Sequence, residues 1–250
     1  MGALAEKLEN SGVIKSKELF NLYVRIKGSY PLFQSGYYRF KGRVSTHSLV
    51  KKMVEGRTYN SLIFSVTIPE GFDLKKIIAR AKRLGLNHEK LERLSKDQSF
   101  LRAHGIKASS LEGFLYPATY RFYNEFPEEE EFFGRMIRHF FATLPNRYLE
   151  TLKKKGISLE KAVNMASLIE KESALESEKP KISEIIWRRL KKNMALGIDA
   201  AIIYGIKDYN GDLTFAHLRD RENPYNTRVH KGLPPTAIGS PSLSSLQAVL

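Results

Sequence analysis

Hydrophobic and polar positions in the first part of the chain alternate between helical and strand-like spacing. Apolar residues recur every three to four positions in short segments bounded by a capping serine or a terminal glycine, which predicts helices over 4–12, 16–28 and 45–56. Residues 36–40 are β-prone, and residues 62–68 alternate apolar and polar side chains with a period of two. Asp73 is placed to cap a further helix that ends at Gly85. The pattern predicts a small α+β region.

From Pro127 onward the pattern is mostly helical. Four glutamates, Glu128 to Glu131, occupy the expected first turn of a helix, where the helix dipole stabilises anions, so we expect a structural role for them. Apolar stripes predict further helices over 158–172 and 180–194, and the chain becomes loop-rich after residue 208. The expected fold class is α+β: a small N-terminal α/β region followed by a mainly helical α+β domain.

The helix predicted over 158–172 is the most informative element, because apolar side chains surround most of it. At 100° per residue the clearly polar face is narrow and consists of Glu160, Asn164, Ser167 and Lys171. Glu170 and Glu172 fall on or beside the apolar arc, at the helix end where the dipole disfavours anions. Both factors raise a carboxyl pKa, as a general acid near neutral pH requires. The pattern alone nevertheless favours a structural interpretation, in which these carboxylates form salt bridges to Lys171, Arg188 or Arg189.

The composition is that of a folded, basic protein. The 250 residues include 42% hydrophobic and 11% aromatic residues, which excludes a disordered chain. An excess of 41 Lys and Arg over 27 Asp and Glu gives a net charge of +14, which predicts an anionic partner such as nucleic acid, lipid headgroups or an acidic polymer. Cysteine is absent, which excludes disulfides, thiolate nucleophiles and cysteine-ligated metal sites.

Familiar catalytic motifs other than paired carboxylates are missing from the sequence. The six histidines lack metal-ligand spacing, no serine lies in a nucleophile elbow, and no glycine-rich phosphate loop is present. Glu112 is a further candidate carboxylate, because it lies in the aromatic-rich segment 111–120. The aromatics there could pack in the core or form a platform for sugar rings; we expect packing for the aromatics and a polar role for Glu112.

Several blocks of the sequence resemble, in order and spacing, the motifs of the MltG (YceG-like) endolytic murein transglycosylase family. They are residues 67–71, 111–122, 165–172, 199–205, 224–227 and 232–235. The resemblance covers nearly the whole chain. It implies a LysM-like, membrane-proximal region over 1–66 and a YceG-type catalytic domain over 67–250 that is incomplete at its C-terminus.

Two places depart from the family pattern. Gly197 and Ala200 flank Asp199 where the family usually has Gln and Pro, and 240–242 read Ser-Pro-Ser where the family usually reads Asn-Pro-Gly. Neither departure touches Glu172.

The resemblance also implies a reaction and a set of site residues. The reaction is cleavage of the MurNAc-β-1,4-GlcNAc bond inside glycan strands to form 1,6-anhydroMurNAc ends, with no metal or cofactor. The second Glu of the Glu-Lys-Glu motif is the family's catalytic acid; it corresponds to Glu172 and overturns the structural interpretation for that residue. Substrate-binding roles are implied for Glu112, Glu170, Asp199, Tyr204, Tyr225, Asn226 and Thr227.

The partners expected from this resemblance are peptidoglycan glycan strands and cell-wall synthases. An N-terminal anchor, absent from this chain, would hold the protein in the bacterial inner membrane as a single-pass protein, with its catalytic part on the periplasmic side. The positive charge suits both the stem-peptide carboxylates of peptidoglycan and an anionic leaflet. A noncatalytic peptidoglycan-binding or scaffold module is the alternative. Nucleic acid is not expected as a partner, because the sequence carries no recognition motif.

Overall fold

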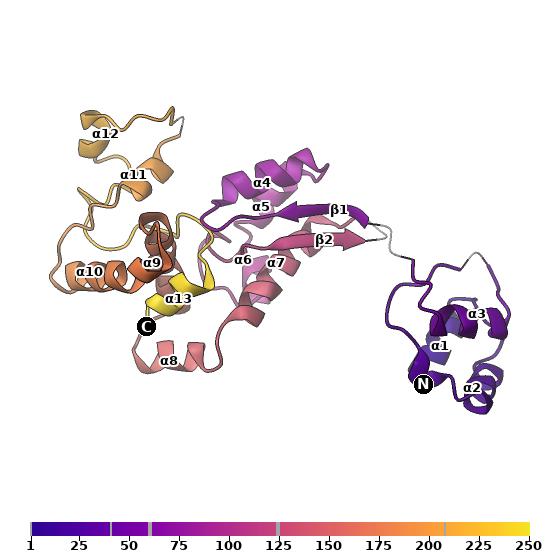
Figure 1. Ribbon diagram of the computed structural model, residues 1–250. Helices are drawn as coiled ribbons and strands as arrows, with labels where there is room; N and C mark the ends of the chain where they lie inside the picture. The colour runs from indigo at the N-terminus through magenta and orange to yellow at the C-terminus, as the bar shows by residue number, and fades with distance from the viewer. Residues whose placement is uncertain (1, 41, 60–61, 124–125, 208) are drawn as a thin grey trace. The chain divides into compact units, whose positions relative to one another are not determined.

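The computed structural model of the chain describes residues 2–40, 42–59, 62–123, 126–207 and 209–250 (Figure 1). The chain divides into two compact units, one formed by residues 1–63 with 123–125 and the other by residues 64–122 with 126–250. Each unit has its own hydrophobic core. No described helix is long and apolar enough to cross a membrane.

The first unit is built from short helices that bury one face each. They are α1 (Gly2–Asn10), α2 (Lys17–Ile26), the 3₁₀ helix η1 (Tyr30–Leu32) and α3 (Thr46–Val54). Ser16 and Ser45 accept hydrogen bonds from backbone N–H groups of the first turns of α2 and α3, so the predicted helix starts are confirmed. The strand expected over 36–40 is wrong: the described part of this unit offers that segment no partner strand, and an unpaired strand is not stable.

The second unit is mainly helical with a small sheet, which confirms the α+β class. Strands β1 (Leu62–Thr67) and β2 (Thr119–Tyr123) lie side by side in a two-stranded sheet, and β1 leads into this unit from the first (Figure 1). Its remaining elements are α4 (Leu74–Arg83), α5 (His88–Leu94), α6 (Gln98–Ala103), α7 (Glu129–Thr143), α8 (Tyr148–Lys154), α9 (Leu159–Glu172), η2 (Glu176–Glu178), α10 (Lys179–Lys191), α11 (Asp199–Gly205), α12 (Phe215–Arg219) and α13 (Leu243–Ala248).

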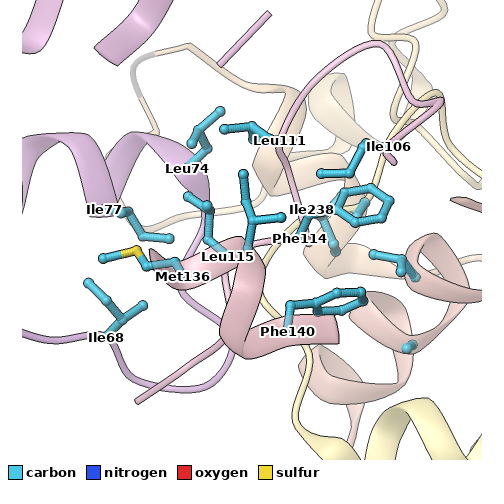
Figure 2. Packing of buried hydrophobic residues seen from close by; sticks show 14 of the residues in the cluster. Ile68, Leu74, Ile77, Ile106, Leu111, Phe114, Leu115, Met136, Phe140 and Ile238 are labelled. Atoms are coloured by element: carbon cyan, nitrogen blue, oxygen red, sulfur yellow. The ribbon is translucent and has the colours of Figure 1, made fainter. Parts of the chain in front are cut away.

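Helix α9 is the centre of the second unit. Its residues 162–169 are all buried: the apolar positions are confirmed, but Asn164 and Ser167, which the pattern placed on the polar face, are buried too because other segments pack on that face. Figure 2 shows Leu111, Phe114 and Leu115 turned toward the same apolar cluster as Ile77 and Ile238. The glutamates at the start of α7 have the structural role that the sequence predicts. Lys90 Nζ lies 3.1 Å from a carboxylate oxygen of Glu129 and 2.8 Å from one of Glu130.

One long loop, residues 232–242, is fixed onto α9 at two points. The side chain of Asn164 donates to the Pro234 carbonyl at 2.7 Å, and the Ser167 hydroxyl accepts from the Ile238 N–H at 3.0 Å. The turn that follows β1 is bound to the same loop, because the Gly71 N–H donates to the Ser240 carbonyl at 2.8 Å. Segments far apart in the sequence therefore meet along α9.

Candidate active site

Glu172 is the last residue of α9, and its side chain is exposed. The expectation that it lies among apolar neighbours is therefore wrong, because the chain leaves the helical conformation at Ser173, just beyond the covered part of α9. The surrounding protein still desolvates the carboxyl group and raises its pKa; the negative charge of Asp199 adds to the rise, and the positive charge of Arg189 opposes it. The direction of the shift matches that expected of a general acid.

Asp199 is the first residue of α11, and it forms an ion pair with Arg228. The Asp199 Oδ1 atom lies 2.9 Å from Arg228 Nε and 2.8 Å from Arg228 Nη2. This two-point contact fixes the orientation of Asp199, whose negative charge acts on Glu172. Sequence reasoning missed Arg228, although its position directly after the Asn-Thr motif of 226–227 is a signal that could have found it.

Glu170 has a different environment from Glu172, although only one residue separates them. Its Oε2 atom accepts hydrogen bonds from the Ser242 N–H at 2.9 Å, the Ser242 hydroxyl at 2.5 Å and the Ser245 hydroxyl at 2.6 Å, and it pairs with Lys179 at 3.4 Å. Burial raises the pKa of Glu170, but the hydrogen bonds from Ser242 and Ser245 outweigh it and the net pKa is lowered. The expected rise is thus wrong for Glu170, which joins α9 to the start of α13 as an anion.

Glu112 is buried, at 3% exposed, beside the first turn of α4. Its two carboxylate oxygens accept from the Leu74 N–H at 3.1 and 3.0 Å, and the Tyr204 hydroxyl donates to Oε2 at 2.7 Å. Burial raises the pKa of Glu112 to about 7, against the opposing effect of the hydrogen bonds from Tyr204 and Leu74. These hydrogen bonds join the start of α4 to α11. A polar role for Glu112 was expected from the sequence, and this is the role that the structure gives it.

We predict that Glu112 makes the second unit less stable as the pH rises through neutrality. The folded-state pKa of about 7 lies above the ordinary value of 4.5, so folding favours the protonated carboxyl. The stability gained from this group is complete below pH 4.5 and is lost as the pH rises toward 7; the loss is roughly 3 kcal/mol at most. Glu112→Gln stays neutral and should remove this pH dependence in urea unfolding at pH 5 and pH 8. An equal loss of stability in both proteins would contradict the assignment.

Tyr204 and Tyr225 form an aromatic pair on the wall of a large hollow. Their ring centroids lie 4.8 Å apart, and the Tyr225 hydroxyl is 2.9 Å from that of Thr236. Burial raises the pKa of both tyrosines, so both remain neutral donors and acceptors at physiological pH. The hollow has a volume of about 890 Å³, and its lining includes four cations, Lys75, Lys82, Lys96 and Lys207. Aromatic faces beside ammonium groups suit sugar rings that carry carboxylates.

Asn226 and Thr227 are buried and satisfied by internal partners. The Asn226 amide donates to carbonyls of 217, 218 and 220, at 2.7 Å for the shortest. The Thr227 hydroxyl accepts from the Ile198 N–H at 2.8 Å and donates to the Ile198 carbonyl at 3.0 Å. These bonds fix the loop beside Asp199, so the structure gives both residues a positioning task and places neither side chain at the surface. Their implied contact with substrate stays a prediction.

Lys171, between the two glutamates, is half-buried, whereas the sequence pattern placed it on the polar face of the helix. Its pKa is lowered by burial and by the positive charge of Lys76, while Asp73, Glu112 and Glu170 oppose the shift. The side chain lies against the backbone of two glycine-bearing turns: a Cβ atom on Gly239 would be 3.3 Å from Lys171 Cε. Within the described ranges, no three His, Asp or Glu side chains gather as metal ligands would.

The chain was compared with known proteins. The model of the YceG-like family matches residues 1–250. The endolytic murein transglycosylase of Bacillus subtilis (strain 168) is 31% identical over 271 residues, which cover 100% of this chain and 72% of that protein. The endolytic murein transglycosylase of Streptococcus pneumoniae serotype 2 is 28% identical over 269 residues, with 96% of this chain and 48% of that protein covered.

A solved structure agrees with these relatives. The crystal structure of a YceG-like protein from Listeria monocytogenes superposes with a TM-score of 0.68 at 28% identity, and covers 98% of this chain and 84% of that one. Because the family model matches from the first residue to the last, and because relatives and solved structure agree with it, the chain belongs to the YceG-like family.

Proposed function

We propose that this protein is a peptidoglycan lytic transglycosylase that cleaves the MurNAc-β-1,4-GlcNAc bond within glycan strands. The observation that carries the proposal is Glu172: an exposed carboxyl with a raised pKa, in the Glu-Lys-Glu motif of a chain whose relatives are named endolytic murein transglycosylases. Such a carboxyl is both reachable by a polymer and able to hold a proton. The hollow with its tyrosine pair and lysines supports a substrate of sugar rings and carboxylates.

In this proposal Glu172 serves twice. As an acid it donates its proton to the glycosidic oxygen while the C1–O bond breaks; as a carboxylate it then takes the proton of the muramoyl C6 hydroxyl, whose oxygen bonds to C1. The product is a 1,6-anhydro end, and the acid is regenerated. One carboxyl is enough because the nucleophile belongs to the substrate, whereas most glycosidases need two carboxylates.

The other site residues have supporting roles in the proposal. Burial raises the pKa of Glu172 and the negative charge of Asp199 adds to the rise, while the ion pair with Arg228 fixes the position of Asp199. Tyr204 and Tyr225 offer faces on which sugar rings stack. Glu170 anchors the end of α9, and Asn226 and Thr227 hold the loop beside Asp199.

The proposed place of action is outside the cytoplasmic membrane, where peptidoglycan lies. Relatives named as murein transglycosylases support that location. Attachment to the inner membrane through a preceding anchor, and association with cell-wall synthases, remain part of the proposal.

The proposal is tested by digestion of purified, uncrosslinked glycan strands and mass spectrometry of the products. Fragments with 1,6-anhydro ends are expected. Reducing ends would indicate a hydrolase instead, and an absence of products together with retained strand binding would favour the noncatalytic binding module.

The pH profile provides an independent prediction about Asp199. A general acid works in its protonated form, so kcat/KM should fall as the pH rises through the raised pKa of Glu172. Asp199→Asn removes the negative charge that helps to raise this pKa and leaves Arg228 without its counter-charge. Both effects move the alkaline limb of the kcat/KM profile to lower pH. An unchanged limb in Asp199→Asn would contradict the coupling, whatever the change in absolute rate.

A further inference from the structure

Helix α2 of the first unit presents aliphatic side chains to solvent. Leu19, Leu22 and Ile26 are 65%, 54% and 74% exposed. At 100° per residue these three positions fall within one narrow stripe along the helix. Phe20 and Val24, roughly opposite, are fully buried in the core that α2 shares with α1 and α3. Helix α2 is thus apolar on two faces, and the fold of its own unit uses only one of them.

An exposed stripe of this kind marks an interaction surface. Single exposed apolar residues are common in folded proteins, but three large aliphatic side chains on successive turns of one short helix form a continuous strip. Apolar exposure continues along the chain in η1, where Tyr30 and Leu32 are also exposed. Water leaves these side chains when an apolar partner covers them, so the covered state is lower in free energy.

The stripe lies in a strongly basic part of the chain. Residues 1–63 contain 11 Lys and Arg against 4 Asp and Glu. The segment that carries the stripe holds four cations and one acid: Lys15, Lys17, Arg25, Lys27 and Glu18. In the helical projection Arg25 and Glu18 lie along the same edge of the stripe. Lysine and arginine can lay their alkyl stems along an apolar surface and keep the charged group in water. The stripe therefore calls for a partner that is apolar at its centre and anionic at its border.

We propose that this face of α2 docks on an anionic lipid surface, with Leu19, Leu22 and Ile26 among the upper acyl chains and the neighbouring cations at the lipid phosphates. The net positive charge of both units disfavours a second copy of the chain, or the second unit, as the occupant. A glycan strand fits less well, because sugar rings stack on aromatic faces and the stripe on α2 is aliphatic. An anionic bilayer meets both requirements. The inference does not depend on the proposed reaction.

The test is co-sedimentation of the whole chain with vesicles made of equal parts of phosphatidylglycerol and phosphatidylcholine. Binding should be much weaker to vesicles of phosphatidylcholine alone, and added salt should weaken it. A net charge of +14 would by itself attract the protein to anionic vesicles, so the stripe needs a variant of its own. Leu19→Gln with Ile26→Gln leaves every charge in place and keeps residues that favour a helix. This double variant should bind anionic vesicles roughly tenfold more weakly.

Two single variants separate the stripe from general surface effects. Leu149→Gln is the matched control, because Leu149 is an exposed leucine of helix α8 in the second unit, and it should bind vesicles as the unmodified protein does. Glu18→Gln removes the one acid beside the stripe and should strengthen binding about fivefold, the value of one elementary charge near an anionic leaflet. Equal vesicle affinities of the unmodified protein and the Leu19→Gln, Ile26→Gln variant would overturn the proposal, because net charge alone would then explain the binding.

A fluorescent label distinguishes lipid from the other occupants. The chain contains no cysteine, so Leu22→Cys provides a unique attachment point for an environment-sensitive dye. The emission of this dye should shift to the blue when anionic vesicles are added, and that of the same dye on Leu149→Cys should not. Emission that is already blue-shifted without vesicles and stays unchanged would overturn the proposal, since the second unit or a second copy would then cover the face; sedimentation velocity tells these two apart by mass. A shift with glycan strands but not with vesicles would also overturn it.

Discussion

Glu172→Gln is expected to lower the rate of anhydro-end formation by about 10²- to 10⁴-fold, the usual contribution of a positioned general acid. Glutamine is close in size to glutamate but does not exchange a proton at neutral pH, so both proton transfers of the proposed reaction are lost. The side chain is exposed, and a surface substitution of this kind changes stability by only about 0.5 kcal/mol. The measurement is anhydro-product formation from glycan strands, with thermal unfolding recorded on the same samples.

Glu184→Gln is a matched control, because Glu184 is an exposed carboxylate of the neighbouring helix α10, with a side chain 74% exposed. It should leave both rate and stability unchanged. Glu170→Gln is the informative comparison: it should lower stability through the loss of an anion that accepts three hydrogen bonds. A Glu170→Gln protein that is fully stable yet as inactive as Glu172→Gln would show that the acid has been assigned to the wrong carboxylate. Normal activity of Glu172→Gln would refute the mechanism outright.

The second large effect is expected from Lys179→Met, which should destabilise the second unit by about 3–5 kcal/mol. The Lys179 and Glu170 side chains are 5% and 10% exposed, and the ammonium group also donates to the hydroxyls of Ser242 and Ser244 at 2.8 Å. Removal of the cation leaves a carboxylate in a poorly solvated place between α9, α10 and α13. Urea unfolding followed by far-UV circular dichroism measures the effect.

Arg188→Met breaks an exposed ion pair with Glu184 on the same helix and is the control, with an expected change below about 1 kcal/mol. The double variant Lys179→Met with Glu170→Gln should recover much of the loss, because no buried charge then remains unpaired. A Lys179→Met protein as stable as the control would mean that solvent reaches Glu170 freely.

The pH dependence of this pair follows from the lowered pKa of Glu170. A carboxyl whose folded-state pKa lies below its ordinary value of 4.5 stabilises the fold at pH values above 4.5, and this stability is lost as the pH falls through the folded-state pKa. Glu170 and Glu112 therefore change the stability of this unit in opposite directions as the pH rises.

Some features of α9 follow from its own sequence, and others depend on the elements that pack around it. The periodicity of apolar residues predicted this helix, its start at Ser158 and its buried apolar residues, because those features depend on spacing within one segment. It placed Asn164 and Ser167 on a polar face, yet both are buried. The same periodicity wrongly extended the covered face to Glu172, since a helical projection does not tell where the neighbouring elements end. It also did not identify Lys179, which follows a turn and a 3₁₀ segment, as the partner of Glu170.

The sequence by itself determined the α+β class, the approximate bounds of several of the longer helices and the motif blocks, because capping residues, apolar spacing and residue order are local properties. Only the tertiary structure decided that Glu112 bonds to Leu74 and Tyr204, that Asn226 and Thr227 face inward, and that the pKa values of Glu170 and Glu172 shift in opposite directions. These properties depend on groups up to 92 positions apart in the chain that meet after folding, and on how completely water is displaced from each.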